Sequence, residues 1–280
     1  MKWAGMGAAS VPLSSVLKKS VRVSKNAKND PKKTQGGKKR LNLGMASYTF
    51  REFNLDDTLT MTKRLGLERI ALKSFHLPLE AKDEEIKAVA DKVRKAGLDL
   101  YGCGVVYMQN EDEVNRAFHY AETAGMKVII GAPNPNLLQM VNKMVNKSDI
   151  KLAIHNHGPG DEHYPTPESA YIKIKNLDPR VGLCIDIGHT QRSGVDPSES
   201  AKKFSDRLLD VHIKDVTAAA KEGQTVEIGH GVIDIPKFLR TLLELNYEGS
   251  VSFEFEKDPD DPLPGVAESV GYVRGVLAAL

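Results

Sequence analysis

Cysteine is scarce in this chain of 280 residues, which contains only Cys103 and Cys184. Two cysteines on two different predicted strands form neither a disulfide framework nor a metal-type pair, so they give no information about the compartment. A glycine-rich phosphate loop of recognised spacing is also absent, so no motif supports a phosphorylated substrate. No stable membrane span is expected, because the mildly apolar stretch at residues 1–17 is too short to cross a bilayer as a helix.

The net charge is small, at +2, but it is unevenly distributed. Residues 1–40 contain eleven Lys and Arg against one acid, Asp30, which leaves 28 basic and 36 acidic residues in residues 41–280. The first segment has no apolar period, so we expect a disordered basic leader at 1–40 and one domain at 41–280. An acidic domain lacks the basic surface that phosphate backbones require, so nucleic acid is not expected as a partner.

The first residues resemble the apolar part of a twin-arginine export signal. The phrase KWAGMGAAS is typical of the region that follows the two arginines, but no arginine pair precedes it here. If such a pair lies upstream in the genomic frame, we expect export to the periplasm. If residue 1 is the true start, we expect an uncleaved leader and a cytoplasmic protein.

Strand-like and helical segments alternate through the rest of the chain. Strands are expected at 41–50, 69–74, 98–107, 127–133, 151–158, 182–189, 208–215 and 250–256. Several helical segments between them begin with acids, end with bases and stop at a glycine, as at Gly66, Gly97 and Gly125. Eight β–α units predict an α/β fold, a single (β/α)8 TIM barrel in residues 41–280.

The last four predicted strands share one pattern, with large apolar groups on one face and ionisable groups on the other. The ionisable groups are those of His155 and His157, Asp186, His212 and Lys214, and Glu254 and Glu256. The carboxyl ends of the strands of a parallel barrel meet at one face, so these side chains are expected to converge there. A set of His, Asp, His and Glu suits a divalent transition ion, namely Mn, Co, Fe or Zn, better than Ca.

The phrases IHNHG, CIDIGHT, DVHIKD and FEFEKDP, in that order, make residues 41–280 resemble the xylose isomerase-like barrels, a family of sugar phosphate isomerases and epimerases. The resemblance implies a xylose isomerase-like TIM barrel with one divalent metal ion. Carried over from the family pattern, the metal ligands fall on His155, Asp186, His212 and Glu254. The family usually has Glu at the position of His155, so this chain departs from the pattern there.

The resemblance also implies residues on the substrate side of the site. His157 corresponds to a His often found two residues after the usual Glu, and His189 and Lys214 correspond to substrate-side positions. His230 and Asp234 lie in a segment that, in the family, often closes over the sugar. Tyr48 and Phe50, which end the first strand, and Lys73 and His76, which follow the second strand, are weaker candidates for the pocket wall.

The departure at His155 bears on the mechanism. Two-base epimerases of this group use two metal-bound glutamates, and a neutral His in place of one keeps a ligand but removes a base. Glu256 is then the expected acid or base, with His157 and His189 as further candidates and Lys214 beside the developing oxyanion. We expect proton abstraction next to a carbonyl of a small sugar or keto-sugar, with isomerisation or β-elimination favoured over two-base epimerisation.

Several alternatives stay open. The main expectation is a metal-dependent sugar isomerase or epimerase, and a keto-sugar or keto-glycoside lyase or dehydratase can use the same site. A phosphodiesterase of the endonuclease IV kind shares the layout but needs more ligands and a basic surface. A non-catalytic sugar-binding barrel is the third class, because fold does not fix function. Glu254 and Glu256 can exchange roles, and the sequence assigns no oligomeric state.

Limited proteolysis tests the expected boundary between leader and domain. A segment with eleven basic residues, one acid and no apolar face is expected to be cut while residues 41–280 resist the protease. Mass spectrometry of the fragments locates the cuts. An intact leader attached to a domain that is cut internally would show that the boundary is misplaced.

Overall fold

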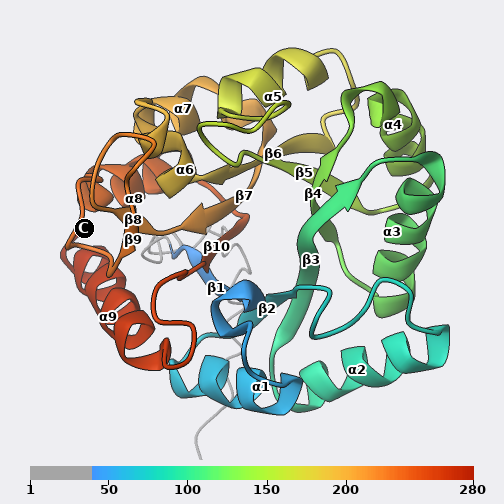
Figure 1. Cartoon of the computed structure of the whole chain (residues 1–280), viewed down its shortest axis with the longest axis horizontal. Helices are drawn as coiled ribbons and strands as arrows, with labels where there is room; N and C mark the ends of the chain where they lie inside the picture. Colours follow the sequence, from blue (N-terminus) through green and yellow to red (C-terminus); the bar gives the residue numbers. More distant parts are fainter. Residues whose placement is uncertain (1–39) are drawn as a thin grey trace, which may run out of the picture. The chain divides into compact units, whose positions relative to one another are not determined.

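A closed barrel of eight parallel strands lies at the centre of residues 40–280, which are the residues that this computed structural model describes (Figure 1). Around the barrel the strands follow the order β1-β10-β7-β6-β5-β4-β3-β2. Their bounds are β1 (Asn42–Ala46), β2 (Arg69–Leu72), β3 (Asp99–Met108), β4 (Val128–Pro133), β5 (Lys151–His155), β6 (Val181–Asp186), β7 (Leu208–Ile213) and β10 (Ser250–Phe253). The predicted single TIM barrel is confirmed. The predicted leader lies, except for Arg40, outside the described residues and stays a prediction.

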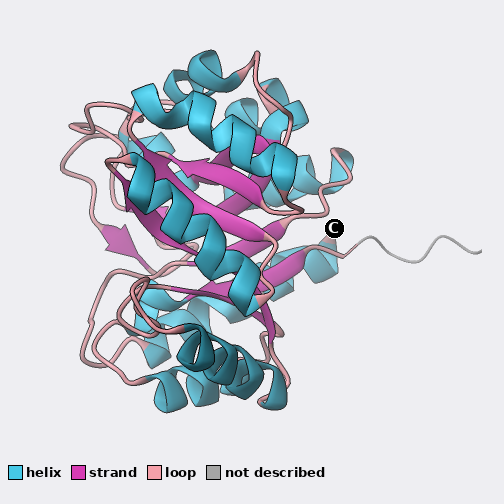
Figure 2. Ribbon diagram, turned by 90° about the vertical axis from the view of Figure 1, so that its right-hand side faces the viewer, coloured by secondary structure: helices cyan, strands magenta, loops and turns pink. Residues whose placement is uncertain are grey.

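Helices follow the strands and surround the barrel (Figures 1 and 2). They are α1 (Leu55–Arg64), α2 (Asp83–Lys95), α3 (Glu111–Ala124), α4 (Leu138–Lys147), α5 (Pro167–Ile174), α6 (Ile187–Arg192), α7 (Pro197–Lys203), α8 (Ile235–Glu244) and α9 (Leu263–Ala279). Shorter elements are the 3-10 turns η1 (Ser47–Phe50), η2 (Pro135–Leu137) and η3 (Ser205–Arg207), and the hairpin of β8 (Asp215–Val216) and β9 (Thr225–Val226). In residues 40–280, no helix combines the length and the apolar character that crossing a membrane requires.

All four predicted strands that carry the candidate site residues end earlier in the structure. The strand predicted at 151–158 ends at His155 and the one at 250–256 ends at Phe253, so His157, Glu254 and Glu256 follow their strands. The predicted strand at 182–189 ends at Asp186, because the Asp186 side chain accepts a hydrogen bond from the backbone N–H of His189 and so caps α6. The predicted strand at 208–215 ends at Ile213. His189 and Lys214 therefore lie beyond the strands, on a helix and in a connection, instead of within the barrel wall.

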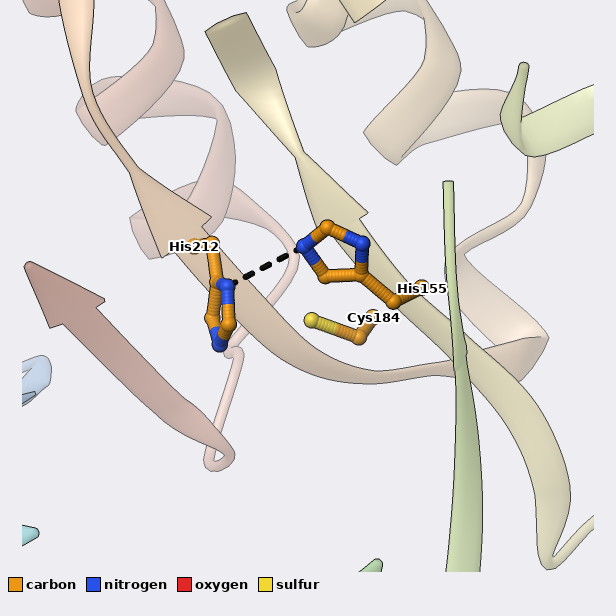
Figure 3. A group of neighbouring side chains, drawn as sticks. All are labelled: His155, Cys184 and His212. Atoms are coloured by element: carbon orange, nitrogen blue, oxygen red, sulfur yellow. Dashed lines mark hydrogen bonds between the residues drawn. The ribbon is translucent and has the colours of Figure 1, made fainter. Parts of the chain in front are cut away.

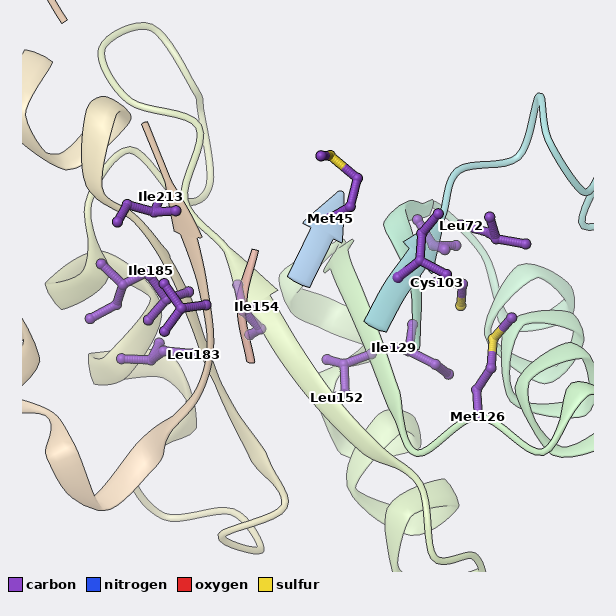
Figure 4. Close-up of a cluster of buried hydrophobic side chains, with 14 of the residues drawn as sticks. Met45, Leu72, Cys103, Met126, Ile129, Leu152, Ile154, Leu183, Ile185 and Ile213 are labelled. Atoms are coloured by element: carbon purple, nitrogen blue, oxygen red, sulfur yellow. The ribbon is translucent and has the colours of Figure 1, made fainter. Parts of the chain in front are cut away.

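The strands bury two separate apolar layers, as alternation predicts. The outer layer packs on the helices and includes fully buried side chains from most strands, among them Met45, Leu72, Ile129, Leu152, Ile154, Leu183, Ile185 and Ile213 (Figure 4). The smaller inner layer consists of Ala71, Tyr101, Ile130, Ala153 and Cys184. Because Ala153 and Cys184 face inward, the residues two places further along β5 and β6 face inward as well, at the carboxyl end of the barrel.

A buried arginine fixes the connection that leads into β6. Arg207 is 7% exposed and donates hydrogen bonds to the backbone carbonyl oxygens of Ile174, Lys175, Leu177, Asp178 and Val181. These carbonyls belong to the end of α5, to the segment that follows it and to Val181, the first residue of β6. The guanidinium therefore holds this segment against the start of β7 and sets where β6 begins.

Replacing this arginine tests how much the connection contributes to stability. Arg207→Met removes all five hydrogen bonds from this guanidinium to backbone carbonyl oxygens, two of which are buried, so we expect the free energy of unfolding to fall by about 3 kcal/mol. Urea denaturation followed by circular dichroism measures the change. The matched control is Arg116→Met, which removes an exposed ion pair with Glu80 and is expected to cost less than about 1 kcal/mol. Equal losses in the two variants would contradict the assigned role of Arg207.

Candidate metal centre and active site

Four ionisable side chains from four neighbouring strands converge at the carboxyl end of the barrel. His155 ends β5, Asp186 ends β6, His212 lies in β7, and Glu254 directly follows β10. All four are buried, with Asp186 0% exposed and Glu254, the most accessible, 7% exposed. One nitrogen or oxygen atom of each lies within 4.8 Å of the corresponding atoms of the others. The structure thus brings together the four residues that the sequence analysis named as metal ligands.

The spacing of these atoms fits a metal ion. His155 Nε2 lies 3.1 Å from His212 Nδ1 (Figure 3) and 3.4 Å from Asp186 Oδ2. His212 Nδ1 lies 3.1 Å from Glu254 Oε2. Ligand atoms that bind one ion at about 2.0–2.2 Å are themselves separated by roughly 3.0–3.5 Å. The donor set of two imidazoles and two carboxylates is a possible metal site, and this set suits a divalent transition ion.

The carboxylates around Lys214 carry more negative charge than this one ammonium group balances, which favours binding of a further cation. Lys214 Nζ lies 2.9 Å from Asp186 Oδ2 and 2.7 Å from Glu254 Oε2, and it donates a further hydrogen bond to Glu256. Three carboxylates against one ammonium leave an excess of negative charge in a buried cluster, which is unfavourable unless it is balanced. A carboxylate oxygen has more than one lone pair, so it can contact Lys214 and an ion together.

The protonation states of His155, Asp186 and Glu254 agree with a cation site, whereas at His212 Glu254 outweighs burial and raises the pKa. Burial lowers the pKa of His155 to about 3, so its imidazole is neutral near pH 7, the form that binds metals. Burial alone would raise the pKa of Asp186, but His189 and Lys214 outweigh it and hold the pKa below its ordinary value. Burial also opposes ionisation of Glu254, and Lys214 more than compensates, so its pKa is lowered as well. Both carboxylates are therefore ionised.

A small cavity of about 170 Å³ opens beside this cluster. It is lined by Tyr48, Lys73, Val105, Tyr107, His155, His157, His189, Glu254 and Glu256. The predicted catalytic residues His157, His189 and Glu256 therefore share one cavity with two of the possible ligands. Lys214 does not line the cavity, because it is 2% exposed and lies among the carboxylates. Its placement beside a substrate oxyanion stays a prediction.

The two histidines on the cavity wall are each held by a neighbour. His157 Nε2 lies 2.9 Å from the Tyr107 hydroxyl, and the two rings are stacked with their centroids 5.4 Å apart. His189 is oriented by α6, whose first turn is capped by Asp186, and its Nδ1 lies 3.3 Å from a guanidinium nitrogen of Arg192. Both imidazoles are therefore fixed at the side of the cavity near β5 and β6.

The cavity also contains residues that the sequence analysis did not name or named only as weaker candidates. Tyr107, in β3, was not named, and Lys73, directly after β2, was only a weak candidate. The signal was nevertheless present, because both lie at the carboxyl ends of predicted strands. Val105 and Tyr107 line the cavity although Cys103 lies in the outer layer, so the register shift of β3 between Cys103 and Val106 interrupts simple alternation there.

Four of the weaker candidates for the substrate pocket have structural contacts elsewhere. Phe50 is fully buried in the outer apolar layer, and His76 is buried with hydrogen bonds to Ser47 and Thr58. His230 forms an ion pair with Glu268, and Asp234 caps α8. None of these four candidates lines the cavity, whereas Tyr48 does.

Cys184 offers an alternative donor set with His155 and His212. The three side chains lie close together, with the sulfur below the His155 ring and beside the His212 ring in the view of Figure 3. Burial raises the pKa of the Cys184 thiol well above its ordinary value, so it supplies no negative charge in the absence of an ion. The set with Asp186 and Glu254 supplies two negative charges and is the better match for a divalent ion.

Comparison with known proteins gives the following matches. Residues 46–276 match the family model of xylose isomerase-like TIM barrels. An inosose dehydratase from Clostridium tetani (strain Massachusetts / E88) is 31% identical over 156 residues, which cover 49% of this chain and 51% of that protein. The rhizopine catabolism protein MocC from Rhizobium meliloti is 34% identical over 140 residues, which cover 44% of this chain and 42% of that protein. The chain thus spans about half the length of the curated relatives it matches.

A solved structure agrees with the fold. The crystal structure of IOLI protein with a binding zinc atom superposes with a TM-score of 0.72 at 19% identity, covering 85% of this chain and 99% of that chain. At this identity the likeness concerns the fold alone. The zinc atom belongs to that protein, so the identity of any ion in this chain has to be measured.

Metal content of two isosteric variants tests the donor set. Asp186→Asn removes one charge from the carboxylate set, and we expect metal affinity to fall at least about 10-fold. Cys184→Ser is the matched control and is expected to bind as the unaltered chain does. Both variants are loaded with Zn²⁺ or Co²⁺, dialysed and analysed by mass spectrometry of the metals. If Cys184→Ser loses the metal and Asp186→Asn retains it, the ligands would instead be His155, Cys184 and His212.

Proposed function

The chain belongs to the xylose isomerase-like TIM barrel family, and we propose that it is a divalent-metal-dependent enzyme acting on a sugar or keto-sugar. The proposed reaction begins with removal of a proton from the carbon next to a carbonyl group. It continues by β-elimination, in which an oxygen on the following carbon leaves. The observation that carries the proposal is the position of Glu256, a carboxylate outside the donor set, in the same cavity as His155 and Glu254.

The metal ion would be held by His155, Asp186, His212 and Glu254. When bound there, a divalent ion polarises the carbonyl and adjacent hydroxyl of a substrate and so acidifies the neighbouring C–H bond. The mixture of imidazole and carboxylate favours Mn, Co, Fe or Zn.

Glu256 is the proposed base. Its side chain is 33% exposed and lines the cavity, whereas one of its oxygens is held by Lys214. This anchoring leaves the other oxygen for a substrate proton and fixes the direction in which it points. Lys214 thereby positions three carboxylates at once. His157 and His189 are the other proton acceptors on the wall, but His157 Nε2 is already engaged by Tyr107.

Elimination is favoured over two-base epimerisation by the donor set itself. His155 is neutral, so the donor set does not supply a second metal-bound glutamate as base. The curated relatives support the same choice, since several are named inosose dehydratase, and dehydration is elimination of water. Isomerisation and epimerisation, the first choice from the sequence, share the initial proton removal and differ in the product. A non-catalytic sugar-binding barrel would bind the same ligands without turnover.

Substitution of the base separates these possibilities. Glu256→Gln removes the proton acceptor but leaves the four ligands, so we expect metal content to be unchanged and kcat to fall by about 10²–10⁴-fold. The assay follows a panel of keto-sugars in D2O by NMR, which reports deuterium at the abstracted position and any released group. The matched control is Glu80→Gln, an exposed glutamate whose ion pair is with Arg116.

The possible results assign the role. Full activity of Glu256→Gln would move the base to His157 or His189. A product that has exchanged deuterium but lost no group would favour isomerisation or epimerisation over elimination. If the metal-loaded protein neither exchanges deuterium into any keto-sugar of the panel nor converts one, the non-catalytic sugar-binding function would be favoured.

A further inference from the structure

A second lysine faces the possible metal ligands from across the barrel. Lys73 follows β2, and in the strand order β2 lies four places from β6 in either direction, which makes it the strand opposite Asp186. Its side chain lines the same cavity as His155 and Glu256. A substrate that fills this cavity would therefore lie between the donor set and the ammonium group of Lys73.

The surroundings of Lys73 differ from those of Lys214. Lys73 Nζ donates to the backbone carbonyl oxygen of Val105 and lies 5.5 Å from the centre of the Tyr107 ring. Among residues 40–280 it forms no ion pair with a carboxylate, whereas Lys214 contacts three. An ammonium group has three N–H donors, so Lys73 keeps donors for a bound molecule. The backbone N–H of Lys73 donates a hydrogen bond to Ser47 Oγ at 2.8 Å, which holds the backbone from which this side chain extends.

The proposed elimination needs such a group. Loss of an oxygen from carbon as hydroxide or alkoxide is slow unless a proton reaches that oxygen as the bond breaks. Lys214 does not line the cavity, and its three carboxylates raise its pKa well above the ordinary value although burial opposes this. At Lys73 burial has the larger effect and lowers the pKa, which makes proton donation easier.

We propose that Lys73 is the general acid of this site, which protonates the oxygen that leaves the carbon β to the carbonyl. This proposal rests on the proposed function. Glu256 takes the proton from the α carbon, and the electrons of that C–H bond form the new C=C bond. The C–O bond breaks with its electron pair on oxygen, and that oxygen takes a proton from Lys73. The alcohol or water departs, Lys73 is left as the amine and Glu256 as the acid, and solvent restores both.

Two substrates that differ in the leaving group test this role. One keto-sugar carries a methoxy group on the β carbon and the other a 4-nitrophenoxy group, which departs without an acid. For Lys73→Met we expect kcat to fall by about 10²-fold or more with the methoxy substrate and by less than about 10-fold with the nitrophenoxy substrate. Lys73→Arg keeps the positive charge but does not donate its proton near neutral pH, so it is expected to behave like Lys73→Met.

Controls separate this proposal from the proposed function. Lys92→Met, at an exposed lysine that pairs with Asp56, is expected to retain activity with both substrates. Metal content and the unfolding midpoint of the Lys73 variants check that the site is intact, and deuterium exchange at the α carbon checks that proton removal persists. Equal losses with both leaving groups, full activity of Lys73→Met, or full activity of Lys73→Arg would overturn the role of Lys73. Absence of exchange and elimination in the unaltered protein would instead reject the proposed function.

Discussion

The constraint on which the site depends is the burial of Asp186 and Glu254 close together. Two ionised carboxylates removed from water and placed side by side are strongly unfavourable unless cations accompany them. Lys214 supplies one positive charge, but it also binds Glu256, so the cluster retains an excess of negative charge. The imidazole of His155 is kept neutral by burial, whereas at His212 burial is outweighed by Glu254, which raises the pKa, and both rings provide nitrogens at distances that suit an ion. The donor atoms and the negative charge of a possible metal site are therefore already in place in the folded chain.

The barrel delivers these groups through strand register. His155 lies opposite Cys184 in the pairing of β5 with β6, and Asp186 lies opposite His212 in the pairing of β6 with β7. A shift of one residue in β6 would turn Asp186 towards the helices and Ile185 towards the cavity. The outer apolar layer opposes such a shift, because it already buries Ile185 completely. Packing on the outside of the barrel thus determines which donors point inward.

Alternation along the strands predicted much of this from the sequence. It placed His155, Asp186, His212 and Glu254 on inward faces at the carboxyl end, where the structure has them. It did not predict that the Asp186 side chain would end β6 by capping α6, nor that Lys214 would lie among three carboxylates instead of on the cavity wall. Those outcomes depend on contacts between segments far apart in the chain. Lys73 was a weaker candidate for the pocket wall, and the structure places it there because barrel closure sets β2 opposite β6.

The contrast between the two lysines shows how one residue type acquires two kinds of chemistry on a single scaffold. Lys214 is surrounded by carboxylates, and their charge keeps its proton in place although the group is buried. Lys73 is partly buried with a carbonyl oxygen as its hydrogen-bond partner, so desolvation prevails and the proton is held less firmly. The difference follows from neighbouring charge, since both groups are removed from bulk water. Lys214 thus holds the carboxylates in place with a fixed positive charge, whereas Lys73, on the facing wall of the cavity, has the more acidic ammonium group. The proposed elimination uses both kinds of lysine.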